Sequence, residues 1–254
     1  MSGSALSNPS GALAQIRAAL NAGDAPGARS LAETARRAFP GDAALADTAG
    51  DLAIKAGDAA TAEAHFAAAC TAAPQITDYA INHAIALQQL GRHASAIAIL
   101  TAHESAGRRD ARYASVRATS ERARGDLAEA ARWYDIAISL DPARPRALHG
   151  RARVALESGE ADATARFDRA LAVNPGDAEL WLGKAQALEV AGDPAGARII
   201  AEQIAQQAPA FLPGLTFLAG LRLTAGEADF TAPFRAAAAR VPQDPNIAAT
   251  HIET

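Results

Sequence analysis

Side chains able to carry catalytic chemistry are few and scattered in this 254-residue chain. Of its six histidines, His83, His93 and His103 fall on different predicted helices, without a carboxylate at the spacing typical of a metal site. The sequence contains no GxxxxGK(S/T) loop, no GxGxxG after a strand, no GxSxG turn and no HExxH motif. We therefore expect no enzyme activity, no cofactor and no metal.

Three further sets of residues have simple structural explanations. His251 and Glu253 form an H-x-E pair that resembles the first two ligands of non-haem iron oxygenases, but no distal histidine follows, so a frayed chain end is favoured. Cys70, the only cysteine, has no Lys, Arg or His beside it to lower its pKa, which indicates a buried small apolar residue rather than a reactive thiol. Trp133 and Tyr134 could stack on a ligand, but core or groove-edge packing is favoured, with only Trp133 open to exposure.

Charge is the most informative feature of the side chains. Residues 108–153 contain eleven Arg and six acidic residues, a net charge of +5. Because the whole chain carries −4, the rest must carry −9. This local excess could attract an acidic partner, or it could be a solvated face with internal Arg–Asp pairs.

The elements that must position these residues follow one repeated pattern of Gly, Ala, a large apolar residue, Ala and Pro. The template consists of Gly125, Ala130, Tyr134, Ala137 and Pro142. The same residue classes return at identical offsets in Gly57, Ala62, Phe66, Ala69 and Pro74. They return a third time, with one residue missing from the spacing, in Gly159, Ala163, Phe167, Ala170 and Pro175. The pattern resembles the tetratricopeptide repeat family, in which small residues lie where two helices cross. The resemblance implies an all-α solenoid, coiled as a right-handed superhelix.

Seven repeats of this kind cover most of the chain, with fourteen antiparallel helices and no strand. We place the repeats at 9–42, 43–76, 77–110, 111–144, 145–177, 178–211 and 212–244, after a flexible segment 1–8 and before the start of an incomplete eighth repeat or tail at 245–254. A glycine marks the turn between the two helices of each repeat, because glycine adopts a left-handed backbone without steric cost. These glycines are Gly23, Gly57, Gly91, Gly125, Gly159, Gly192 and Gly226.

Helix crossings are predicted to use small residues and the core to use large ones. The small column includes Gly50, Ala84, Ala118, Ala152, Ala185 and Ala219 on first helices, and Ala28, Ala62, Ala96, Ala130, Ala163 and Ala197 on second helices. The large column includes Phe66, Leu100, Tyr134, Phe167, Trp181 and Phe234. At the ends, we expect Asn8 and Pro9 to open the first helix, and Pro233 to delay the last one, with Thr231 as its cap.

Some repeats depart from the family pattern. The first-helix aromatic position is Trp only at Trp181, which predicts packing on smaller side chains elsewhere. The third repeat has His103 for the usual Ala and Arg108 for Pro, so its end is the weakest assignment. Phe230 replaces Ala in the seventh repeat, which leaves its second helix in doubt.

The resemblance implies that a concave groove is lined by the second, fifth, ninth and twelfth residues of each first helix. In repeats four and five these predict a partner-binding groove that includes Arg112, Ser115, Thr119, Arg122, Arg146, His149 and Arg153. In repeat two the same positions include Asp47 and Asp51, so the groove is predicted to run from acidic to basic.

One branch of the family binds peptide C-terminal carboxylates through a clamp of Lys, Asn and Arg side chains. On the first repeat of such a clamp, Asp47 and Asp51 stand where Lys and Asn are expected. Asn82 matches the Asn of the second repeat. On the third repeat, Arg112 stands in place of Lys and Val116 in place of Arg. Two carboxylates would repel the carboxylate of such a ligand. A clamp of this kind is therefore not expected, although the arginines could still bind acidic segments.

Three classes of function fit these features. The favoured one is a non-enzymatic scaffold that binds a partner peptide or protein segment, one possibility being an acidic segment, in the groove. The alternative is the docking or regulatory region of a longer enzyme of the oxygenase, sulfotransferase or glycosyltransferase type. RNA binding is disfavoured, because only Tyr113 and Trp133 accompany the arginine cluster as stacking groups.

The remaining expectations concern surroundings and assembly. Net charge of −4 predicts no general attraction to nucleic acid or to membranes. The first ten residues have neither the basic nor the apolar region of a signal peptide, no apolar run is long enough to span a membrane, and one cysteine fits a reducing compartment, so we expect a cytoplasmic protein. Phe234, Val241, Ile247 and Ile252 predict self-association through the C-terminal repeat, or a frayed tail there.

Overall fold

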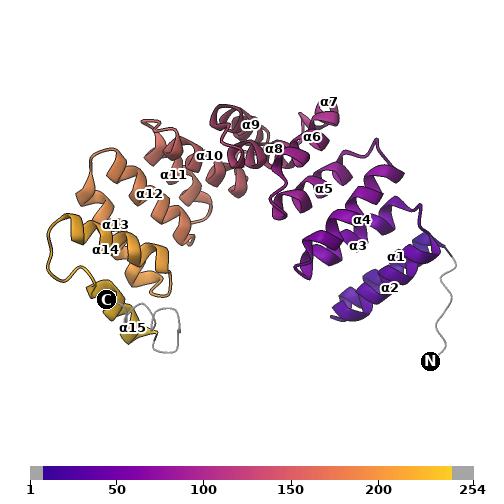
Figure 1. The fold of residues 1–254 in the computed structure, drawn as a ribbon, viewed down its shortest axis with the longest axis horizontal. Helices are drawn as coiled ribbons and strands as arrows, with labels where there is room; N and C mark the ends of the chain where they lie inside the picture. The colour runs from indigo at the N-terminus through magenta and orange to yellow at the C-terminus, as the bar shows by residue number, and fades with distance from the viewer. Residues whose placement is uncertain (1–7, 242–254) are drawn as a thin grey trace. The chain divides into compact units, whose positions relative to one another are not determined.

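A computed structural model describes residues 8–241, and within these residues it contains fifteen α-helices and no strand (Figure 1). The chain divides into two compact units, Met1–Leu140 and Asp141–Thr254. Consecutive helices contact each other within each unit, for example α3 with α4 and α12 with α13. The predicted all-α class and the helix-pair solenoid are confirmed.

The first unit contains four helix pairs. The first helices of these pairs are α1 (Pro9–Asn21), α3 (Ala43–Lys55), α5 (Thr77–Gln89) and α8 (Ala111–Ala123). The second helices are α2 (Ala25–Ala38), α4 (Ala59–Ala72), α6 (His93–Ala102) with the short α7 (Glu104–Gly107), and α9 (Leu127–Leu140).

The second unit contains three helix pairs among its described residues. Its first helices are α10 (Pro145–Glu157), α12 (Ala178–Val190) and α14 (Leu212–Thr224). Its second helices are α11 (Ala163–Val173), α13 (Pro194–Gln207) and α15 (Ala232–Arg240).

Helix ends are set by local sequence, as predicted for the start of the chain. The Asn8 side chain accepts a hydrogen bond from the Gly11 amide at 2.7 Å, and Pro9 is the first helical residue. Aspartates cap later helices in the same way, among them Asp42 and Asp58. All seven predicted turn glycines have positive φ, between 68° and 85°, which is the left-handed region that other residues adopt only with strain.

The prediction of fourteen helices is wrong, because the second helix of repeat three breaks at His103 into α6 and α7. Tyr113 from α8 fills the space at the break, and its hydroxyl donates to the Leu100 carbonyl at 2.5 Å. A Cβ at Gly107 would overlap the Tyr113 ring, so the short helix contacts this ring through a glycine. The departure at His103 seen in the sequence therefore marks a real irregularity.

The last helix begins late, at Ala232, with Thr231 as its N-cap residue, as predicted, but the Thr231 side chain makes no capping hydrogen bond. Its hydroxyl instead donates to Asp229 at 3.4 Å and accepts from Arg235 at 3.0 Å. Phe234 is buried, with 7% of its surface exposed, against Leu215 and Ala237. Ile247 and Ile252 lie outside the described residues.

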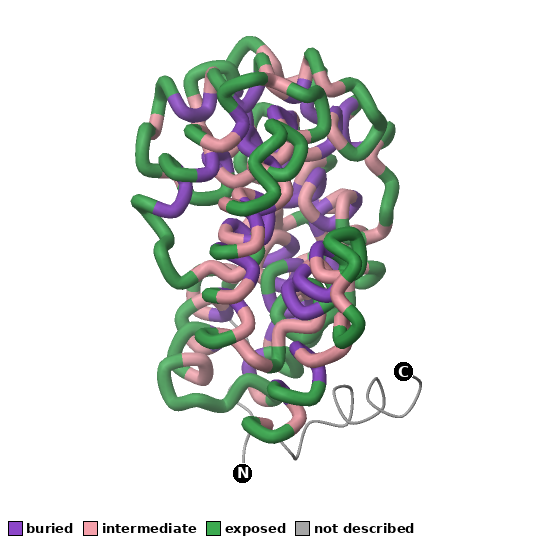
Figure 2. Tube along the Cα trace, turned by 90° about the vertical axis from the view of Figure 1, so that its left-hand side faces the viewer, coloured by how far each residue is buried: buried purple, intermediate pink, exposed green. Residues whose placement is uncertain are grey.

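Buried positions recur along the helices of both units (Figure 2). Every residue of the two predicted small columns is buried, and a Cβ at Gly50 would overlap the Phe66 ring, which shows how closely these helices cross. Trp181 was predicted in the core but is only half-buried, because its indole nitrogen reaches out to the Pro175 carbonyl at 2.8 Å. Trp133, the one aromatic that could have been exposed, is 1% exposed.

Candidate functional site

The candidate site is the first-helix face of each unit, meaning the side on which the predicted groove residues of the first helices lie. Successive first helices contact one another within a unit: α3 contacts α5, α5 contacts α8, and α10 contacts α12. Residues spaced three or four apart on each helix share one side. Equivalent residues of neighbouring repeats are thereby brought side by side.

A hydrogen-bonded ladder crosses this face in the first unit. The Asn82 side chain on α5 donates to Asp47 Oδ1 on α3 at 2.7 Å, and Arg112 Nη2 on α8 donates to Asn82 Oδ1. Both ends of the Asn82 amide are therefore used inside the chain. The ladder joins an acidic first helix to a basic one, which agrees with the predicted change of charge along this part of the groove.

The carboxylates at the acidic end are only partly compensated by neighbouring groups. Burial raises the pKa of Asp47, a rise that the Asn82 hydrogen bond partly offsets and that the nearby Asp51 increases. Burial likewise raises the pKa of Asp51, against the opposing effects of Lys55 and Arg112. A ligand carboxylate would meet this negative charge directly, so the expectation that a carboxylate clamp is disfavoured has physical support here.

The other groove residues predicted on α8 differ in accessibility. Ser115 is fully buried, and its hydroxyl donates to the Ala111 carbonyl at 2.7 Å, so it cannot touch a partner on this face. The half-buried Thr119 donates to the Ser115 carbonyl at 2.9 Å and lies 3.1 Å from the Tyr134 hydroxyl. Arg112 and Arg122 are both half-buried.

The groove residues predicted in the second unit lie on α10. Arg146 is exposed, whereas His149 and Arg153 are half-buried. Arg153 Nη1 donates to Gln186 Oε1 on α12 at 3.3 Å, so equivalent positions of neighbouring first helices meet in this unit as well. The three residues are spaced at i, i+3 and i+7, which places them on one side of the helix.

Internal ion pairs reduce the free charge of the basic segment 108–153. At least five of its eleven arginines pair with carboxylates within 4 Å: Arg108 with Glu104, Arg117 with Glu121, Arg132 with Glu129, Arg144 with Asp141, and Arg151 with Glu160. The interpretation as internally paired arginines thus accounts for part of the cluster.

Two of the paired arginines lie over the Trp133 ring. The guanidinium carbons of Arg117 and Arg132 lie 5.6 and 5.2 Å from its ring centroid, and Tyr113 packs against it edge to face at 5.8 Å. The sequence placed Tyr113 and Trp133 beside the arginine cluster but could not show that arginine and tryptophan would pack together. Trp133 is therefore not available for stacking on a ligand.

His251 and Glu253 lie outside the described residues, and within residues 8–241 the remaining candidate groups show no arrangement typical of an active site. Among residues 8–241 no three His, Cys, Asp or Glu side chains lie close enough to hold a metal ion. Burial, helped by Asp47, raises the pKa of the half-buried Cys70 thiol to about 11. His83 contacts Glu63 at 3.1 Å. No helix in the described part of the chain is long and apolar enough to cross a membrane.

Comparison with protein-family models gives three matches to the family described as tetratricopeptide repeat, over residues 13–75, 81–145 and 149–213. No curated protein sequence matches the chain. Among solved structures, a tetratricopeptide repeat protein from Parabacteroides merdae is similar, with 17% identity and a TM-score of 0.73 over 95% of this chain and 96% of its own.

Two further structures show the same fold at low identity. PilW, described as a widely conserved type IV pilus biogenesis factor, is 15% identical, with a TM-score of 0.71 over 81% of this chain and 96% of its own. The APC/C hetero-tetramer Cut9–Hcn1 gives 16% identity and a TM-score of 0.68 over 92% of this chain and 46% of its own. At these identities the likeness concerns the fold alone.

Proposed function

Because the chain belongs to the tetratricopeptide repeat family, we propose that it is a non-enzymatic scaffold that binds a segment of a partner protein along its first-helix faces. The observation that carries the proposal is the side-chain ladder over α3, α5 and α8, which sets polar groups of successive repeats side by side. An extended or helical segment that follows these helices could contact several repeats at once.

On the basic part of this face, the partner is proposed to contribute acidic side chains. In the second unit the exposed Arg146 and the half-buried His149 and Arg153 share one side of α10. In the first unit Arg112, Thr119 and Arg122 take this role, while the buried Ser115 does not. Arginine supports such a role, since its planar guanidinium binds carboxylates with two parallel hydrogen bonds.

The test is capture of a partner from lysate by the full chain and by its Arg146→Glu/Arg153→Glu variant. The variant should keep its helical content and lose the partner, and capture by the original chain should weaken as salt is raised, because the contacts are partly exposed charges. Undiminished capture by the folded variant would remove this face from the proposal.

A matched control is Arg37→Glu/Arg169→Glu, which changes the net charge equally. Both residues are exposed on second helices, α2 and α11. This variant should capture the partner as the original chain does. Loss of capture in both variants would point to a general effect of charge rather than to contacts on α10.

Two finer proposals accompany this one. We propose a cytoplasmic location, which the single cysteine supports and cell fractionation tests. We also propose self-association through the region 228–254, which light scattering at increasing concentration tests. The burial of Phe234 removes that side chain from the apolar surface on which the second proposal was based.

A further inference from the structure

Within each unit, the seventh residue of a first helix lies beside the second helix of the preceding repeat. These residues are Ala49, His83 and Arg117 in the first unit, and Lys184 and Leu218 in the second. Three of the five are basic side chains, and the two exceptions, Ala49 and Leu218, each line a pocket.

The three basic residues reach polar groups on the preceding second helix. His83 lies 3.1 Å from Glu63 on α4, Arg117 Nη1 donates to Thr101 on α6 at 2.7 Å, and Lys184 Nζ lies 2.6 Å from Asp168 on α11. Arg117 and Lys184 also lie over the tryptophan rings of Trp133 and Trp181. In these repeats, therefore, the protein's own basic side chain occupies the crevice between the first helix and the preceding second helix.

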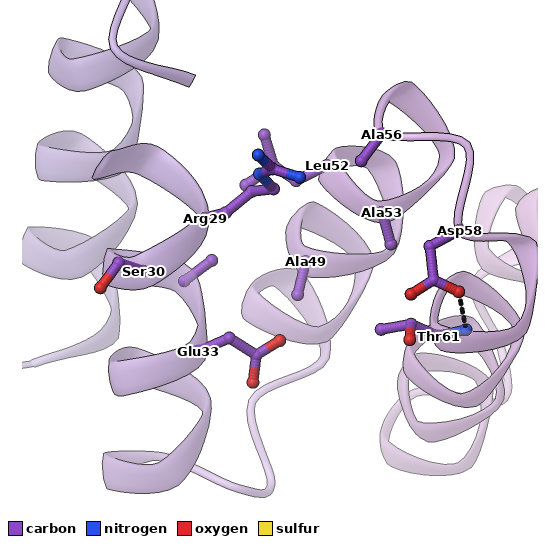
Figure 3. Close-up of a pocket in the computed structure, with 10 residues that line it drawn as sticks. Arg29, Ser30, Glu33, Ala49, Leu52, Ala53, Ala56, Asp58 and Thr61 are labelled. Carbon is purple, nitrogen blue, oxygen red and sulfur yellow. Dashed lines mark hydrogen bonds between the residues drawn. The ribbon is translucent and has the colours of Figure 1, made fainter. Parts of the chain in front are cut away.

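The same crevice is open in repeat two, where the residue is Ala49. A pocket of about 300 Å³ lies here between α2, α3 and the start of α4, and we name it the Ala49 pocket (Figure 3). Its apolar wall includes Ala49, Leu52 and Ala53 of α3. This volume is at the lower end of the range for ligand sites and suits a single side chain.

The mouth of the Ala49 pocket carries two carboxylates and one guanidinium. Glu33 of α2 points into the space in front of Ala49 (Figure 3). Its Oε1 atom lies at hydrogen-bond distance, 3.1 Å, from His65 Nε2. Asp58 faces it from the start of α4, and hydrogen bonds from Thr61 lower the pKa of Asp58, which keeps it ionised. Arg29 of α2 is the one cationic side chain that lines the pocket.

The pocket at Leu218 provides a comparison in the second unit. It is about 400 Å³ in volume and lies between α13, α14 and α15. Its carboxylate, Glu202, already pairs with Arg198 at 3.0 Å and lies 3.9 Å from Arg222. Because Glu202 is already paired with arginines of the chain, we expect this second pocket not to bind a further cation.

We propose that the Ala49 pocket binds an arginine side chain of a partner protein. The bound guanidinium would lie where Arg117 lies two repeats later, with its apolar stem against Ala49 and Ala53 and its donors directed to Glu33 and Asp58. Arginine suits the site better than lysine, because five donors in a fixed plane can reach carboxylates on both sides of the mouth.

This pocket is separate from the first-helix face. Ala49 and Ala53 follow Asp47 and Asp51 by two residues, and two residues turn an α-helix by about 200°. The inference therefore goes beyond the proposed function, and either can fail without the other.

The test uses acetyl-arginine amide as a probe, followed by ¹H–¹⁵N NMR of the full chain at low salt. We expect saturable shifts of the Ala49, Ala53 and Thr61 amides, with a dissociation constant of about a millimolar, as for a small, singly charged ligand. Acetyl-citrulline amide, which has the same shape without the charge, should give none. Equal shifts with both probes, or shifts spread evenly over the chain, would overturn the proposal.

Three variants sharpen this result. Ala49→Arg fills the pocket from within and should abolish the shifts, while Glu33→Gln should weaken binding about tenfold by removing a charged acceptor. Arg29→Ala should strengthen binding, because it removes a positive charge that repels the positively charged probe at the mouth of the pocket. Glu33 and Arg29 are exposed, so their variants test the pocket even if Ala49→Arg does not fold.

Glu189→Gln is the matched control for Glu33→Gln, because it also removes one negative charge from an exposed helical residue, but on α12, away from the pocket. It should bind the probe as the original chain does. A Glu33→Gln variant that titrates like Glu189→Gln would show that Glu33 does not contact the guanidinium.

Discussion

Single residues decide both the turns and the chemistry of this solenoid. Gly125 has a φ of 84° in the turn between α8 and α9, and no neighbouring atom would touch a Cβ placed there. Glycine is therefore needed at position 125 because of the backbone conformation, not because a side chain would lack space. At Cys70, by contrast, the surroundings of the side chain decide its chemistry, because burial raises the pKa of its thiol.

At Gly125 we predict that Gly125→Val lowers the free energy of unfolding by about 1 to 3 kcal/mol, because a β-branched residue is strained at positive φ. Chemical denaturation followed by circular dichroism measures it. Gly176→Val is the matched control: this glycine also has open space around it, but not a positive φ. Equal losses at both sites would show that the turn does not require glycine.

Alkylation of Cys70 should be slow at neutral pH and should keep accelerating up to about pH 11, because its pKa is raised to about 11. A free thiol would level off above its ordinary pKa of about 8.5. Since the folded pKa is the higher one, this group stabilises the fold below pH 8.5 and loses that contribution as the pH rises toward 11. A rate that levels off near pH 9 in the folded protein would contradict the raised pKa.

Close helix crossings are decided at the scale of elements. Gly50 on α3 lies against the Phe66 ring of α4, so the pair can approach only because the side chain is absent. Gly220 on α14 is also helical, but it is exposed and has open space around it. The repeat register predicted a helix crossing at Gly50 and not at Gly220, and the structure shows that only Gly50 packs against another helix.

We predict opposite effects for Gly50→Leu and Gly220→Leu. The first should lower the free energy of unfolding by about 1 to 3 kcal/mol through overpacking against Phe66. The second should raise it by up to about 1 kcal/mol, since leucine favours a helix more than glycine does. Thermal and chemical unfolding of the two variants decide this, and a stable Gly50→Leu protein would mean that the crossing tolerates a larger spacing.

At the scale of the whole molecule, stability is built from neighbour contacts. Every extensive helix contact in the first unit joins helices close in the chain, such as α1 with α2 and α4 with α5. Solenoids of this kind gain stability approximately as a sum of repeat and neighbour contributions.

We therefore predict that a fragment of residues 1–140 folds by itself. It should show a helical circular dichroism spectrum and a cooperative unfolding transition, with a smaller dependence on denaturant than the full chain because it exposes less surface on unfolding. A fragment with the spectrum of a random coil would show that the first unit depends on the rest of the chain.

The sequence by itself determined the repeat, because a turn that needs positive φ admits few residues other than glycine and a close crossing admits only small ones. It also placed Asp47, Asn82 and Arg112 on one face, since a fixed repeat length brings equivalent positions together. The tertiary structure alone decided the break at His103, the burial of Ser115 and Trp133, and the open crevice at Ala49. These depend on which side chains of neighbouring repeats meet, and packing of that kind follows from three-dimensional contact rather than from any local pattern.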